Sequence, residues 1–214
     1  MASWSELGRK IFYPFQLFTT WVHECAHAVS AFLLGAQSIS ITLAPDGSGL
    51  TRYRLKAGRL RQGIITSSGY LGATLAGCGL FFLNIRYQQG HPIISQRTLL
   101  ITLSSITILS LLIWIRNGFG ILVVLALGAV LASFVYFPQL FPYARFALLF
   151  LSIQTALQSL FDIRTLFAVS SKRGSDAHAL AKLWILPHWF WAGTWMGMSL
   201  TSIFFTYRYA LQNA

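Results

Sequence analysis

Six long apolar segments constrain the fold of this chain more than any other feature. Each segment approaches the roughly 20 residues that a helix needs to cross the hydrocarbon core of a bilayer. The segments are residues 11–35, 63–84, 98–115, 119–138, 143–168 and 187–206. This pattern predicts an all-α polytopic membrane protein with about six transmembrane helices. Because no repeat or low-complexity tract divides the chain, we expect a single membrane-embedded domain over residues 1–214.

The charge content supports this interpretation and bears on the partners. Charged residues make up 10% of the chain, whereas a soluble domain carries about 25%. The net charge of +11 comes from 16 Lys and Arg against 5 Asp and Glu. The basic residues cluster in the loops, where membrane topology and anionic headgroups account for them. We therefore expect a lipid bilayer, and no nucleic acid, as a partner.

Residues 37–56 interrupt the helical pattern. From Ser38 to Leu43 the chain alternates polar and apolar residues, which is the period of a strand. The residues Pro45, Asp46 and Gly47 favour a turn, and a second short alternating stretch follows them. The pattern predicts a β-hairpin between the first and second transmembrane helices.

The first apolar segment contains the pattern His-Glu-Cys-Ala-His. In a helix His23 and His27 lie one turn apart and about 40° apart around the axis, so both imidazoles face the same way. Two such imidazoles can hold one Zn²⁺, and Glu24 lies beside them as the general base. The alternative is a pair of packed histidines with a salt-bridged glutamate. Ionisable groups within a membrane are costly and usually functional, so we predict a zinc site.

A catalytic zinc usually takes a third protein ligand. The chain has few candidates, because its acidic residues are Glu6, Glu24, Asp46, Asp162 and Asp176. Asp162 is the one that lies deep in another apolar segment. It continues a polar stripe with Gln154 and Gln158, at a spacing of four residues, which should face the interior of the bundle. We therefore predict Asp162 as the third ligand.

Two alternatives concern these aspartates. Asp162 can instead be a helix-interior carboxylate paired with Arg164 or another residue. Asp176 is the second candidate for the zinc ligand, although Ser175 or Asp176 can simply cap a helix there.

The second apolar segment contains small residues at a spacing of four. Gly69, Ala73 and Gly77 form a face that lets helix backbones approach closely. We interpret this face as ordinary helix packing, with a tight seam beside a site as the alternative.

The distribution of basic residues predicts the orientation. When basic residues are assigned to alternate sides of the predicted helices, the side of the hairpin collects more of them, which places the hairpin in the cytoplasm and the N-terminus outside. The first and fifth segments then both run inward, and the depths of His27 and Asp162 are similar.

Several motifs resemble those of the site-2-protease-like membrane zinc metallopeptidases, and most closely their compact branch without PDZ domains, the peptidase family B-like proteins. The motifs are HECAH, the ISITLAPDGSGLT hairpin, SSGYLGA, RNGFG and SDAHALAKLWILP. The resemblance implies His23 and His27 as zinc ligands, Glu24 as base and a later aspartate as third ligand. Better-known members carry that aspartate in a Leu-Asp-Gly context, whereas this chain has Phe161-Asp162-Ile163.

The resemblance implies an intramembrane zinc metalloprotease that hydrolyses peptide bonds in or near transmembrane segments of substrate proteins. The alternative is a catalytically inactive member that acts as a membrane scaffold or substrate-binding protein. On the protease interpretation, an extended substrate segment pairs with the hairpin, and Asn117 and Gln158 line the path of water and substrate. We expect a multi-pass protein of the bacterial inner (plasma) membrane, and no pattern predicts its oligomeric state.

Overall fold

The computed structural model describes residues 6–56, 58–168 and 175–212, and it is a helical bundle with one small sheet. The elements before the second helix are α1 (Glu6–Leu33), β1 (Gln37–Leu43) and β2 (Gly49–Arg54). The remaining elements are α2 (Arg59–Gln88), α3 (Gln96–Ile113), α4 (Gly118–Tyr136), the 3₁₀ turn η1 (Phe141–Tyr143), α5 (Ala144–Ala168), α6 (Asp176–Leu183) and α7 (His188–Gln212). Each of the six predicted apolar segments therefore forms a helix, and the predicted hairpin is confirmed.

Four stretches of the described residues are long and apolar enough to cross a membrane. They are Arg59–Gln88, Gln96–Ile113, Gly118–Tyr136 and Phe141–Phe167, which correspond to α2, α3, α4 and η1 with α5. The helices α1 and α7 are 28 and 25 residues long but are not among these four. The chain thus has the helices of a multi-pass membrane protein, and the count of six spans stays a prediction.

The hairpin is joined to the α3–α4 turn by backbone hydrogen bonds along the outer edge of β1. Its strands pair antiparallel, with Ile41 opposite Thr51. On the outer edge of β1, the Ile41 amide donates to the Trp114 carbonyl at 2.8 Å and the Arg116 amide donates to the Ile41 carbonyl at 3.0 Å. Within the described ranges the sheet has two strands, so no third strand pairs with the outer edge of β2. That edge is able to accept an extended segment.

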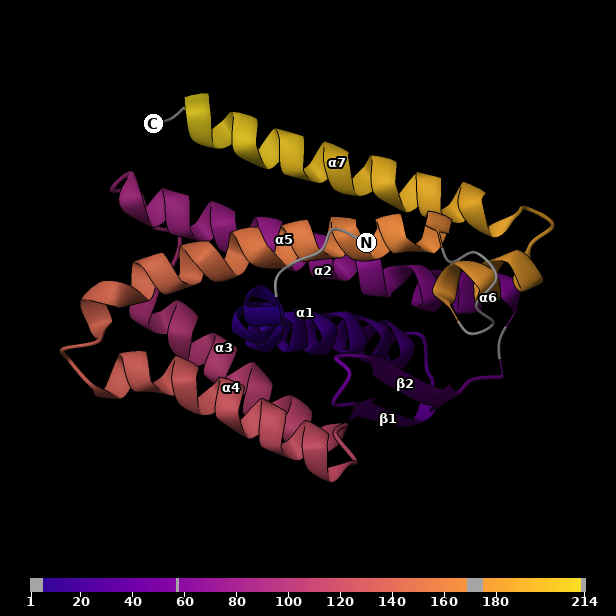
Figure 1. Cartoon of the computed structure of the whole chain (residues 1–214), viewed down its shortest axis with the longest axis horizontal. Helices are drawn as coiled ribbons and strands as arrows, with labels where there is room; N and C mark the ends of the chain where they lie inside the picture. Colours follow the sequence, from indigo (N-terminus) through magenta and orange to yellow (C-terminus); the bar gives the residue numbers. More distant parts are fainter. Residues whose placement is uncertain (1–5, 57, 169–174, 213–214) are drawn as a thin grey trace.

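Apolar packing fixes the hairpin and α6 at the same end of the bundle (Figure 1). Ile41 and Leu43 of β1 are buried in a cluster with Phe18 and Trp21 of α1 and Val124 of α4, among others. A separate cluster joins α5, α6 and α7 through Ile163, Leu166, Ala177, Leu180, Ala192 and Trp195. The turn from α2 to α3 and the C-terminus lie at the opposite end (Figure 1).

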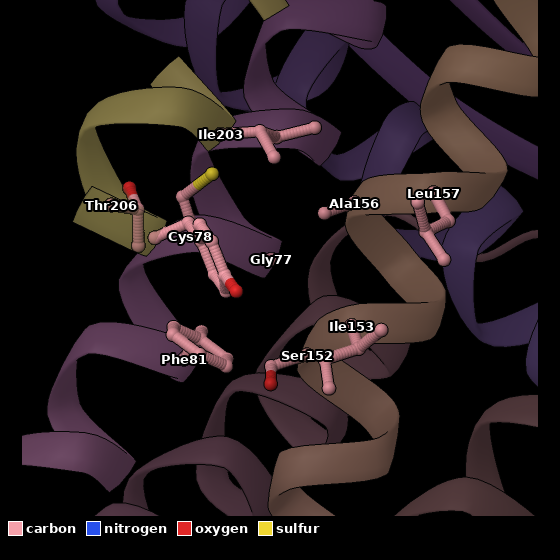
Figure 2. A pocket seen from close by; sticks show the side chains of 10 residues that line it. Gly77, Cys78, Phe81, Ser152, Ile153, Ala156, Leu157, Ile203 and Thr206 are labelled. Atoms are coloured by element: carbon pink, nitrogen blue, oxygen red, sulfur yellow. The ribbon is translucent and has the colours of Figure 1, made fainter. Parts of the chain in front are cut away.

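Helix α2 lies against α1, α5, α6 and α7. Its small residues make this possible. A Cβ built on Gly77 would lie 2.7 Å from the Ala156 nitrogen and 2.9 Å from the Ser152 oxygen, so the backbones of α2 and α5 almost touch there. Beside this contact lies an apolar cavity of about 290 Å³ between α2, α5 and α7 (Figure 2). The predicted packing role of the small residues is therefore confirmed at Gly77.

Candidate metal centre

Helix α1 places the two histidines of the HECAH motif face to edge. Their rings lie with centroids 4.7 Å apart and planes at 80°. The two Nε2 atoms are 3.0 Å apart, and His27 is buried. Both ring nitrogens therefore point toward one small volume, as the spacing of the motif predicts.

Asp176 joins the two histidines from the first position of α6. Its Oδ2 atom lies 3.4 Å from Nε2 of His23 and 3.3 Å from Nε2 of His27. In the part of the chain that the structure describes, these three residues are the only group of three or more His, Cys, Asp or Glu side chains with ligand atoms within 4.8 Å of one another. Two imidazole nitrogens and one carboxylate oxygen form a ligand set typical of catalytic zinc, which keeps a fourth position for water or substrate.

The environment of Asp176 keeps its carboxylate ionised. Burial alone would raise the pKa of this carboxyl, but hydrogen bonds to His23 and His27, together with their charge, outweigh burial and hold the pKa below its ordinary value. An ionised carboxylate is the form that binds a metal.

The packing of α6 explains how Asp176 reaches α1. Ser175 caps the helix, since its side-chain oxygen accepts a hydrogen bond from the His178 amide at 3.3 Å. The apolar face of α6 is buried through Ala177 and Leu180 against α5 and α7. A polar cap and an amphipathic turn thus orient the first residue of this short helix toward the histidines.

A hydrogen bond sets the tautomer of His27. Its Nδ1 atom lies 2.7 Å from the carbonyl oxygen of Ile65, in α2. Because a carbonyl can only accept, Nδ1 carries a proton, so Nε2 is the nitrogen that can bind a metal when this imidazole is neutral. The His23 ring rests edge-on against Tyr70, with ring centroids 4.6 Å apart, and Tyr70 in turn stacks on Trp195. Both imidazoles are therefore held in place from α2.

The residue that faces the histidines from α2 is a glycine. A Cβ built on Gly69 would lie 2.4 Å from Nε2 of His23 and 2.4 Å from Nε2 of His27. An added Cβ would displace both imidazoles, so the glycine lets the two Nε2 atoms lie together against α2, where they and the Asp176 carboxylate form the nitrogen and oxygen donor set that zinc takes. The residues present therefore fit a zinc ion. The alternative interpretation of the small-residue face, a tight seam beside a site, applies at Gly69.

Glu24 is buried beside this group, and it contacts the hairpin. Its Oε2 atom accepts a hydrogen bond of 2.6 Å from the Thr51 hydroxyl, in β2. A Cβ built on Gly49, also in β2, would lie 2.5 Å from Cγ of Glu24. The carboxylate that we expect to act as base therefore lies between α1 and the hairpin.

Asp162, the residue expected as third ligand, is not in the three-residue group, which contains Asp176, the second candidate, instead. The Oδ1 atom of Asp162 accepts a hydrogen bond of 2.8 Å from Gln158, one turn earlier in α5. Two members of the predicted polar stripe on α5 therefore bond to each other along the helix. Asp176 lies at the histidines because α6 packs against α2 and α7.

The side chains expected to line a substrate path are engaged within the protein. Asn117 accepts a hydrogen bond from the Leu43 amide at 3.1 Å and donates one to the Leu43 carbonyl at 2.7 Å. It therefore holds the end of β1 as a neighbouring strand would. Gln158 donates to Asp162.

An open apolar groove of about 880 Å³ runs beside the site, between α1, α2 and the α6–α7 corner. Ala26 and Ser68 line it next to the histidine-bearing face, and Trp184 and Trp191 line it from the α6–α7 corner. The three residues of the candidate metal centre do not line this groove.

The sequence interpretation missed Gly69, Thr51 and the Ile65 carbonyl as parts of the site. Gly69 was identified only as a member of a small-residue face, for which a seam beside a site was the alternative interpretation. Thr51 was visible only as one residue of an alternating strand. Neither residue can be assigned to the site from the sequence alone, because this requires knowing that the hairpin and α2 both lie against the same part of α1.

Comparison with known protein families gives a match over almost the whole chain. The model of the family described as Peptidase M50B-like matches residues 1–206. No match was found among curated proteins or among solved structures.

Proposed function

The chain belongs to the peptidase M50B-like family, and on this premise we propose that it is a zinc metalloprotease that hydrolyses peptide bonds in or near transmembrane segments of other membrane proteins. The observation that carries the proposal is the convergence of His23, His27 and Asp176 on one small volume, with Glu24 beside it. We propose these three residues as the zinc ligands and Glu24 as the general base.

Each part of the site has a task in this mechanism. A zinc ion held by the three ligands supplies Lewis acidity, which polarises a carbonyl and makes water a better nucleophile near neutral pH. Glu24 accepts the proton of the attacking water and returns it to the nitrogen of the leaving amine as the C–N bond breaks. The protonated Nδ1 of His27 donates to the Ile65 carbonyl, which holds this imidazole in place throughout.

The hairpin offers the substrate an extended partner. A transmembrane helix hides its carbonyls in its own hydrogen bonds, so a substrate must unwind before hydrolysis. In the described part of the chain no strand pairs with the outer edge of β2, and Thr51 of this strand contacts Glu24. We propose that the unwound segment adds to this edge as a third strand, which would bring its carbonyl close to the base.

The test of this function uses purified protein and a model transmembrane substrate. The protein should bind about one zinc per chain, and His23→Ala and His27→Ala should each lose most of it. Glu24→Gln should keep the zinc and lower turnover by about 10²- to 10⁴-fold, because only the base is removed. Asp46→Asn, in the exposed hairpin turn, is the matched control and should change neither quantity.

Two outcomes would contradict this function. Stoichiometric zinc in the His23→Ala/His27→Ala double variant would mean that the metal lies elsewhere. A wild-type protein that binds zinc but cleaves no transmembrane substrate would favour the non-cleaving alternative, a scaffold or substrate-binding protein.

We further propose that the protein lies in the bacterial inner (plasma) membrane with the hairpin in the cytoplasm. In a variant with Cys25 and Cys78 replaced by Ala, Arg54→Cys should react with a membrane-impermeant maleimide only from the cytoplasmic side. His91→Cys, between α2 and α3, should react only from the other side. The reverse labelling pattern would invert the topology.

A further inference from the structure

Strand β2 contacts Glu24 through the hydroxyl of Thr51. This hydroxyl lies 2.6 Å from Oε2 of Glu24 and 3.0 Å from the Glu24 backbone carbonyl. It has one proton to donate. The shorter distance is typical of a hydroxyl that donates to an ionised carboxylate, so the carboxylate oxygen is the acceptor.

The same strand confines the other side of the glutamate. The side chains of β2 alternate, so that Thr51 and Tyr53 face inward and Leu50, Arg52 and Arg54 face outward. Gly49 lies on the inward side, and a Cβ there would lie 2.7 Å from Oε1 of Glu24. The Thr51 hydroxyl is hydrogen-bonded to Oε2. Gly49 has no Cβ, and this leaves room for Oε1.

The hairpin that carries Thr51 is itself held at several points. Thr20 of α1 donates to the Gly47 carbonyl at 2.8 Å, and Tyr13 donates to the Pro45 carbonyl at 2.6 Å. Asn117 holds Leu43 from the other side. Because these contacts fix the strand, the position of the Thr51 hydroxyl relative to α1 is fixed as well.

We infer that Thr51 is a positioning residue for the general base. Its hydroxyl holds Oε2 of Glu24 while the backbone at Gly49 confines Oε1, so that β2 sets the orientation of the carboxylate. The inference rests on the proposed function. In that function β2 has two roles, because it pairs with the substrate segment and also orients Glu24. The same strand therefore determines both the register of the substrate and the position of the base.

The kinetic test compares three variants. Thr51→Val keeps the shape and removes the hydroxyl, and it should lower kcat about 10- to 100-fold, the range expected for one hydrogen bond to a charged group. The KM and the zinc content should stay unchanged. Thr51→Ser restores the hydroxyl and should recover most of kcat. Thr42→Val is the matched control, since the Thr42 hydroxyl donates only within the hairpin, to the Leu50 carbonyl.

A double-mutant cycle tests the same contact without any turnover. The apparent Tm is measured for Thr51→Val, Glu24→Ala and the double variant. If the side chains interact, the loss in the double variant is smaller than the sum of the two single losses. The same cycle with Thr42→Val should be additive. Absence of turnover in the wild type would overturn the proposed function, whereas the cycle still reports on the contact.

Three results would overturn the inference. The first is an additive cycle between Thr51→Val and Glu24→Ala. The second is a fall in kcat that Thr51→Ser does not recover. The third is a loss of zinc or a rise in KM that accounts for the whole effect of Thr51→Val, because each would indicate a merely structural role.

Discussion

Asp176→Asn should empty the zinc site, whereas Asp162→Asn should leave the zinc content close to that of the wild type. The reason is geometric. Oδ2 of Asp176 lies within 3.4 Å of Nε2 of both histidines, and Asp162 is bonded to Gln158 instead. An amide in place of the carboxylate removes the one negative charge among the proposed ligands, and a zinc site with two neutral imidazoles binds much more weakly. The measurement is zinc per chain after identical dialysis.

The two aspartates are matched controls for each other. Each substitution exchanges one partly buried carboxylate for an amide of the same shape, so a general effect of the mutation would appear in both variants. We expect turnover to disappear with the zinc in Asp176→Asn. If Asp162→Asn loses the zinc and Asp176→Asn keeps it, then the three-residue group of the structure is not the metal site.

The helices and the hairpin could be predicted from the sequence because their signals are local. Long apolar runs such as residues 119–138 have no stable alternative in a bilayer to a helix, since every backbone polar group must be satisfied internally. The alternation from Ser38 to Leu43 and the turn at Pro45-Asp46-Gly47 likewise depend only on neighbouring residues. The pair of histidines follows from the helical period alone.

The place of Asp176 could not be predicted in the same way. The sequence shows a helix cap at Ser175 and a short amphipathic stretch after it, and both are local features. What brings Asp176 to the histidines is the burial of Ala177 and Leu180 against Ile163 and Trp195, residues of two other helices. Asp162 had the better local signal, a carboxylate on an inward-facing stripe, but Gln158 satisfies it within its own helix.

Asn117 illustrates a second limit. A polar residue between two apolar segments is compatible with a substrate path and also with a cap. In the structure its side-chain amide forms two hydrogen bonds with the backbone of Leu43, 74 residues earlier in the chain. Such a clamp depends on the turn between α3 and α4 lying beside β1, which no local pattern indicates.

The small residues of α2 show why a motif needs its neighbours before it can be interpreted. Gly77 meets the backbone of α5 at the edge of the cavity in Figure 2, and Gly69 meets two imidazole nitrogens. The sequence pattern is the same at both positions. The first glycine permits helix packing, and the second leaves room for the two imidazoles that we propose as zinc ligands.

Gly69→Ala should therefore abolish zinc binding while the bundle still folds. The added methyl group would lie 2.4 Å from Nε2 of both histidines, a separation that only a shift of the imidazoles can relieve. The contacted atoms are the ends of side chains, so the rings can turn away without moving the helix backbones. The ligand geometry would then be lost, and turnover with it. The measurement is zinc per chain, with circular dichroism and apparent Tm of the zinc-free protein as evidence of folding.

Two other glycines of α2 separate this effect from a general intolerance of alanine. At Gly79 nothing lies within 4 Å of an added Cβ, so Gly79→Ala should keep both zinc and stability. At Gly77 the added Cβ would meet backbone atoms of α5, which cannot turn away, so Gly77→Ala should lower the Tm even without zinc. Gly69→Ala should instead lose zinc with little change in the Tm of the zinc-free protein. Full zinc content in Gly69→Ala would mean that metal binding does not depend on the place of the two histidines against α2, and the proposed ligand set would have to be abandoned.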